Sequence, residues 1–396
     1  MQFSGLTGTT CGVVRLLRTL PTRSLVLLAA VAAIVAVGGT AIAVAGGGGG
    51  ATPSPKPLAQ AVRDAMAAPE PDGVTARIKF TNRLFPSGAL DGQVGSALMS
   101  GASGRLWLTN DGRGRLELQS SAGDVQIVWN KQAVTVYDAS SDTVYRAELP
   151  ARKTDARDTA KTPSLARIGD FLDKLAEHAS LSGAIPTNVA GRPAYRVSVS
   201  PKERGGLLGS VQLAWDAARG VPVRAAVYAR GSSKPVLALE ATQISFGPVP
   251  TGDVEVLAPD GAKTTDLGAL GSAHSARSRR HDGGLPVRPA AGFPVTAPAK
   301  LVGLRRQDVR VVGKESKTAL VVYGEGLGAI VVTEHKADAP GGLLRGLPAV
   351  PLDGATGHEL VTPLGTVIEW RRGGVSYILA GSVPSAMAEA AARSLK

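Results

Sequence analysis

The chain has 396 residues, of which 44% are hydrophobic and 4% aromatic, so Ala, Val and Leu must form most of its core. This length is enough for two folded domains together with non-globular segments. The formal net charge is +12, but the basic residues are dispersed along the chain and are not interleaved with stacking aromatics, which argues against a nucleic-acid-binding protein.

The first feature along the chain is an apolar segment, residues 25–45, whose 21 residues would span about 31 Å as a helix, the thickness of a bilayer core. Arg15, Arg18 and Arg23 precede it, and no acidic residue occurs before Asp64. This asymmetry predicts a cytoplasmic tail at residues 1–24, a single-pass signal anchor in the cell membrane, and extracytoplasmic domains after it.

The alternative is a secreted protein, because the end of the apolar segment also fits a cleavage site that would release the chain after Ala45. The only cysteine, Cys11, lies before the apolar segment, so neither an internal disulfide nor a lipid anchor through cysteine is expected. Residues 46–56 are rich in Gly and Pro and predict a flexible stalk.

The first domain is expected at residues 57–260 and begins with a helix whose apolar residues share one face. Apolar and polar residues then alternate from Val74 to Thr81, and similar runs recur up to Glu148, with Asn110-Asp111-Gly112 as a hairpin turn. A second helix follows Ser164, and strand patterns resume from Ala194 to Phe246. The fold class is therefore α+β, a curved antiparallel sheet with covering helices.

Residues 261–292 lack periodicity and predict an interdomain linker, and residues 293–396 predict a smaller C-terminal α+β domain. Its strand patterns form two pairs, around Gly324 and around Gly373, and a helix after Pro384 ends the chain. No nucleophile constellation, phosphate-binding loop or metal-ligand spacing occurs, so we expect no enzyme activity, no catalytic residue, no cofactor and no metal.

Two short motifs in the first domain carry a resemblance to a known family. They are the strand Val189-Ala-Gly191-Arg-Pro-Ala-Tyr195-Arg-Val197, and Leu213-Ala-Trp215-Asp216 followed by Gly220-Val-Pro222. With the order of helices and strands, they resemble the LolA-like superfamily, which includes the lipoprotein carrier LolA and RseB (MucB), a regulator of sigma-E. The segments around Tyr323 and Ala380 are similar to the C-terminal domain of RseB.

The resemblance implies an unclosed β-barrel whose apolar cavity receives acyl chains of a lipid or lipoprotein at the cytoplasmic membrane. It also implies a role as lipoprotein carrier or as envelope sensor, the latter with an anti-sigma factor as partner. The alternative is a non-catalytic structural or interaction protein of the cell envelope without bound lipid. Six side chains are the candidate ligand contacts, although each also fits an ordinary core position: Ile78, Phe80, Leu106, Leu108, Leu116 and Leu118.

Overall fold

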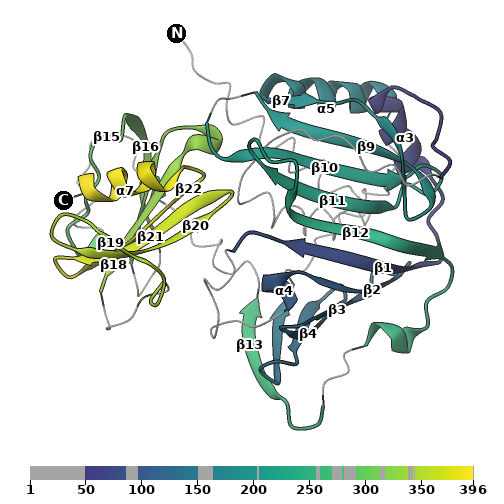
Figure 1. Cartoon of the computed structure of the whole chain (residues 1–396), viewed down its shortest axis with the longest axis horizontal. Coiled ribbons are helices and arrows are strands. Elements are labelled where there is room, and N and C mark those ends of the chain that lie inside the picture. The colour runs from purple at the N-terminus through teal and green to yellow at the C-terminus, as the bar shows by residue number, and fades with distance from the viewer. Residues whose placement is uncertain are drawn as a thin grey trace.

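The computed structural model describes residues 50–85, 97–149, 164–202, 205–255, 259–269, 279–280, 291–312, 317–337, 342 and 344–395. Within these ranges the chain forms two β-sheets with few helices, a large curved one and a smaller one (Figure 1). No helix in the described ranges is long and apolar enough to cross a membrane. The expected signal anchor at residues 25–45 lies outside them.

The first sheet has thirteen strands in the described part of the chain, in the order β13-β6-β5-β4-β3-β2-β1-β12-β11-β10-β9-β7, with β8 paired to β9. All neighbours are antiparallel except β13 and β6. The strands are β1 Gly73–Asn82, β2 Ala102–Thr109, β3 Gly114–Ser120, β4 Gly123–Trp129, β5 Ala133–Asp138, β6 Thr143–Glu148, β7 Ala179–Leu181, β8 Ile185–Val189, β9 Arg192–Pro201, β10 Leu208–Asp216, β11 Pro222–Ala229, β12 Pro235–Phe246 and β13 Lys263–Ala269.

The helices of this domain cover mainly one end of the sheet. In α3 (Leu58–Ala67) Ala61 is buried, and it packs against Tyr195 of β9 and Trp215 of β10. The longer helix, α5 (Leu165–His178), lies beside α3 and leads into β7 (Figure 1). The short α4 (Ala97–Ser100) comes between β1 and β2 in the chain and contacts β1, β3 and β4, and the 3₁₀ turn η1 (Thr251–Val254) contacts β2 and β3.

Several details differ from the sequence expectations. Ser164 caps α5 as predicted, accepting the Arg167 N–H at 3.3 Å, and Leu165, the first residue of the helix, is 44% exposed. Residues 263–269, expected in the linker, form β13 at the edge of the sheet. Lys263 and Thr264 are exposed there, so backbone pairing with β6 holds the strand without an alternating apolar pattern.

The described part of the predicted stalk lies against the first sheet. The Tyr195 hydroxyl donates to the Ser54 carbonyl at 2.6 Å, and the Asn188 amide donates to the Ala51 carbonyl at 3.0 Å. Lys56 lies over the Tyr195 ring, 5.4 Å from its centroid, and pairs with Asp64 of α3 at 2.6 Å. Residues from Ala51 onward are therefore attached to β8, β9 and α3.

The second sheet has nine described strands in the order β14-β16-β17-β18-β22-β21-β20-β19, with β15 paired to β16. The two strand pairs expected from the sequence are β17–β18 and β21–β22, whereas β15, β16, β19 and β20 were not expected and β14 lies in the predicted linker. The strands are β14 Arg279–Arg280, β15 Lys300–Leu301, β16 Leu304–Val312, β17 Thr318–Tyr323, β18 Ile330–Lys336, β19 Ala349–Pro351, β20 Thr356–Thr362, β21 Gly365–Arg372 and β22 Val375–Gly381.

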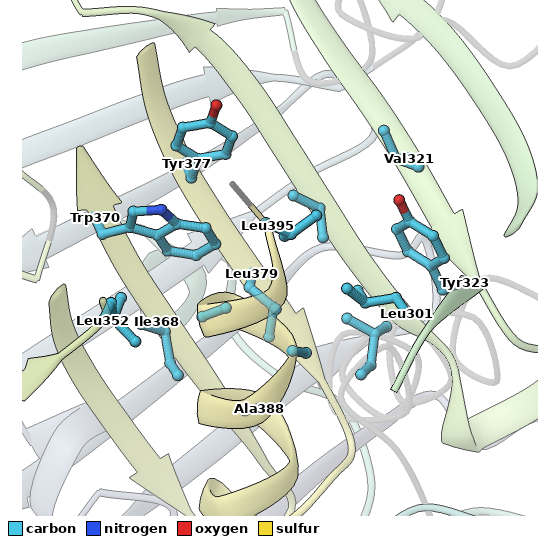
Figure 2. Packing of buried hydrophobic residues seen from close by; sticks show 14 of the residues in the cluster. Leu301, Val321, Tyr323, Leu352, Ile368, Trp370, Tyr377, Leu379, Ala388 and Leu395 are labelled. Carbon is cyan, nitrogen blue, oxygen red and sulfur yellow. The ribbon is translucent and has the colours of Figure 1, made fainter. Parts of the chain in front are cut away.

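The C-terminal helix α7 (Ser385–Ser394) closes one face of the second sheet. Ala388 lies on the side of the helix toward Leu379, in a core that also contains Trp370 and Tyr377 (Figure 2). The rings of Trp370 and Tyr377 stack with centroids 4.9 Å apart. Small alanines on the helix let it approach the sheet closely, so this domain has a dense core of its own.

A carboxyl group is buried in this second core. Glu334 of β18 is fully buried; its Oε2 accepts the Thr296 N–H at 2.8 Å, and its Oε1 has no partner among the described residues. Burial raises the pKa of Glu334 from 4.5 to about 7. Because the folded chain holds this proton more tightly than the unfolded chain, stability falls as the pH rises from 4.5 towards 7.

We therefore expect the second domain to lose up to about 3 kcal/mol of stability between pH 4.5 and pH 8 through this one group. Glu334→Gln should remove most of that loss while leaving the stability at low pH nearly unchanged. Urea unfolding at a series of pH values measures this. Burial also raises the pKa of Glu359, so the difference between wild type and variant is the relevant quantity. Identical pH profiles would show that Glu334 ionises normally in the fold.

Candidate functional site

The inner face of strands β1 to β5 is apolar, and the strand register arranges its side chains in rows that cross the sheet. In antiparallel pairs, directly opposite residues point to the same face. The first row contains Val74, Leu108, Gly114, Trp129 and Val134. The central row contains Ala76, Leu106, Leu116, Ile127 and Val136. The third row contains Ile78, Gly104, Leu118 and Val125.

Burial differs between these rows. In the first and third rows, Val74, Leu118 and Val125 are each only 1% exposed. In the central row only Ala76 is buried, and the four larger side chains from β2 to β5 stay half-buried. An aliphatic stripe across four strands is therefore less covered than the rows on both sides of it.

Strands β11 and β12 contribute the opposite wall. A small pocket lies between the two halves of the sheet, and all its walls are apolar. It is lined by Val74, Ala76, Ile78, Leu106, Leu108, Val221, Pro222, Val223, Leu239, Ala241 and Ile244. Its volume is about 20 Å³, room for roughly one water molecule, so it is too small for an acyl chain. This pocket is therefore far smaller than the open cavity that the family resemblance implies.

The six predicted contacts all lie on this inner face. Ile78, Leu106 and Leu108 line the pocket directly. Leu116 and Leu118 lie in the central and third rows, and Phe80 packs at the end of the same cluster. The structure thus brings the predicted residues together, but it buries Ile78, Leu108 and Leu118 as core and leaves Phe80, Leu106 and Leu116 half-exposed.

Sequence reasoning missed the residues that complete the face. Ile127 and Val136 extend the central row, and Ile244 of β12 stands opposite. The alternation in Val125–Trp129 carries the signal for Ile127, but only the register shows which row it joins. Sequence reasoning also missed the role of Gly114. A Cβ at this position would lie 2.2 Å from the Trp129 ring, so the absence of a side chain makes room for the indole.

Phe80 connects the inner face to the second domain. It packs against the inner-face cluster and also against a separate cluster around Leu208, Val227 and Leu237. That second cluster includes Leu364 of the second domain, which is fully buried. Nearby, the Leu207 N–H donates to Ser382 Oγ at 2.9 Å, and Ser382 Oγ donates to the Leu364 carbonyl at 2.8 Å. The two domains therefore meet at a packed interface that Phe80 shares.

The described residues contain no cluster of three His, Cys, Asp or Glu side chains that could hold a metal ion. The inner face carries no charged residue in its first and central rows. The third row continues from Val125 to Asp138 of β5, so the apolar character is confined to the first two rows and the β1–β4 part of the third.

No protein-family model matches the chain, and no curated protein matches it. Among solved structures, a crystal structure of MucB in complex with MucA(peri) is similar, with 16% identity and a TM-score of 0.37 over 86% of this chain and 96% of that one. The complex structure of Pseudomonas aeruginosa MucA/MucB gives 16% identity and a TM-score of 0.37 over 85% and 94%. An uncharacterized conserved protein from Thermus thermophilus gives 11% identity and a TM-score of 0.31 over 53% and 96%.

The row assignment predicts that alanine substitutions of two leucines in β3 lower the free energy of unfolding by different amounts. Leu118→Ala should lower the free energy of unfolding by about 3 kcal/mol, because it leaves a void in a buried row. Leu116→Ala should cost about half of that or less, because its side chain is already partly exposed. Urea unfolding followed by tryptophan fluorescence compares them. Equal losses of free energy in the two variants would mean that the central row is as fully buried as the rows on both sides of it.

Proposed function

We propose that the chain is an extracytoplasmic, membrane-anchored binding protein whose inner sheet face takes up an acyl chain of a lipid or lipoprotein. The observation that carries this proposal is the half-buried central row, Leu106, Leu116, Ile127 and Val136. Apolar surface in water costs about 25 cal/mol per Å², so such a stripe favours a ligand or a covering segment.

Uptake requires the two halves of the sheet to separate, because the pocket between them holds only about 20 Å³. Separation would expose Ile244 and Leu239 on one wall and Leu106 on the other. An acyl chain between these walls would make apolar contacts with each wall, in place of the apolar contacts that the walls make with each other. The cost of opening is therefore offset by burial of the ligand.

The role that fits best is that of an envelope sensor. Phe80 packs against both the inner-face cluster and the interdomain cluster, so an acyl chain that displaces it would disturb the cluster that contains Leu364 of the second domain. A sensor needs such a link between ligand and second domain, whereas a lipoprotein carrier does not. The partner that the RseB resemblance implies, an anti-sigma factor, belongs to this sensor role.

The attached segment after the proposed anchor limits how far the first domain can lie from the membrane. Only residues 46–50 separate the end of the apolar segment from Ala51, which accepts the Asn188 hydrogen bond. Five residues reach at most about 18 Å. With the anchor retained, the edge formed by β8 and β9 stays near the bilayer surface, and the chain does not shuttle as a carrier must.

A second candidate function is a non-catalytic structural or interaction protein of the envelope without bound lipid. The small volume of the pocket favours it, because a face closed by its own side chains needs no ligand. Neither candidate is an enzyme.

Lipid retention in a matched pair of variants tests the proposal. Full chains are extracted in mild detergent, washed and measured by native mass spectrometry. Leu116→Asn should reduce the retained lipid several-fold relative to wild type, because an amide on the stripe must be desolvated without a partner. Lys79→Gln changes an exposed residue on the opposite face of β1 and should leave retention unchanged.

Lipid held by the anchor segment is the same in all three proteins and cancels in the comparison. Equal retention in wild type and Leu116→Asn, with circular dichroism showing both folded, would support the lipid-free candidate instead.

A further inference from the structure

The outer face of the first sheet carries an open hollow on the side opposite the apolar stripe. Its volume is about 370 Å³, within the size range of small-molecule sites. The hollow crosses three strands, β12, β1 and β2. It is lined by Thr75, Ala76, Arg77, Arg105, Trp107, Gln243, Ile244 and Ser245.

The strand register explains how this hollow forms. Two rows of outward side chains cross it, Ser245–Thr75–Trp107 and Gln243–Arg77–Arg105. Beside the second row, the pairing of β1 and β12 shifts register between Arg77 and Ile78, which leaves Thr242 as an extra residue on β12. A β-bulge of this kind increases the local bend of a sheet. The small Thr75 and Ser245 side chains lie beside the larger Trp107 in the first of these rows.

Two guanidinium groups stand at one end of the hollow. Arg77 and Arg105 are directly opposite each other on neighbouring strands, and both are exposed. Like charges in such a cross-strand pair destabilise a sheet. Neither side chain makes a hydrogen bond or ion pair with another described residue; the nearest carboxylate in the rows, that of Glu117 opposite Arg105, is paired with Arg115.

The indole beside them is held in place. The Arg115 guanidinium, on a side chain only 7% exposed, lies 5.5 Å from the centre of the Trp107 ring. Arg115 also donates to the Glu255 carbonyl at 3.3 Å, next to η1. Trp107 therefore has a fixed orientation at the side of the hollow, with Arg105 two residues earlier on the same strand.

We infer that this hollow binds a phosphate group, held by the paired guanidinium groups of Arg77 and Arg105. Planar guanidinium groups bind phosphate oxygens through two parallel hydrogen bonds, and two such groups match the charge of a phosphate ester. Thr75, Gln243 and Ser245 supply further hydrogen-bonding groups, and the Trp107 ring packs against the ester's carbon atoms. The phosphate belongs either to a phospholipid headgroup or to a free phosphate ester. The site does not rest on acyl-chain binding, because it lies on the other face of the sheet.

The test uses the full chain in detergent without phosphate headgroups, titrated with glycerol phosphate by calorimetry, and the full chain in flotation with vesicles. The vesicles contain phosphatidylglycerol diluted in an uncharged glycolipid, and vesicles of the glycolipid alone serve as background. Arg77→Gln and Arg105→Gln each remove one guanidinium from the hollow. Lys79→Gln is the matched control, because it removes one exposed charge from the same face of β1 outside the hollow.

We expect the wild-type chain to bind glycerol phosphate, the phosphatidylglycerol vesicles, or both. The affinity should fall about tenfold in each arginine variant and less than twofold in Lys79→Gln. Binding of glycerol phosphate identifies a soluble ester as sufficient ligand, and arginine-dependent binding of phosphatidylglycerol vesicles alone identifies a headgroup site. Two results overturn the inference: no binding in either arm, or equal losses in all three variants, which would reflect net charge only. Lipid retention by Leu116→Asn is a separate readout, so the two proposals fail independently.

Discussion

Strict alternation of apolar and polar residues along hydrogen-bonded strands gives a sheet one apolar face and one polar face. The rest of this structure follows from how the apolar face of the first sheet is shielded from water. Among the described helices, α3 packs on β9 and β10, and only the short α4, through Leu98, packs on the inner face of β1 to β5. The sheet solves this largely by bending onto itself, with Ile78 and Leu118 in one cluster with Val223. The bend buries two rows and leaves the row between them half-exposed, and that remaining stripe gives the protein its candidate site.

The bend also shapes the opposite face and the contact with the second domain. Strand β1 lies in the middle of the sheet, between the two halves. Its inward residues line the apolar pocket, its outward Thr75 and Arg77 line the basic hollow, and Phe80 near its end reaches the interdomain cluster. A change in the bend would therefore alter both faces and the interface together. In the proposed function, a ligand on the inner face would influence the second domain in this way, without contacting it.

Much of the first sheet could be predicted from the sequence, because β1 to β6 and β9 to β12 alternate clearly and turns such as Asn110-Asp111-Gly112 separate them. Strand β13 could not, since an exposed edge strand paired through its backbone needs no apolar pattern. The six predicted contacts share one face of the sheet for the same reason. Their unequal burial could not be predicted, because it depends on register and on β11 and β12, far away in sequence. The basic hollow was missed because Arg77 and Arg105 become neighbours only through strand pairing.

Photo-crosslinking in the membrane tests the central claim most directly. The full chain is exposed to a phospholipid with a diazirine in its acyl chain, irradiated, digested and mapped by mass spectrometry. The account predicts labelled peptides from β2 to β4, at or next to Leu106, Leu116 and Ile127, in addition to any label in the apolar segment at residues 25–45. Label confined to that segment, with none on the inner face of the sheet, would contradict it.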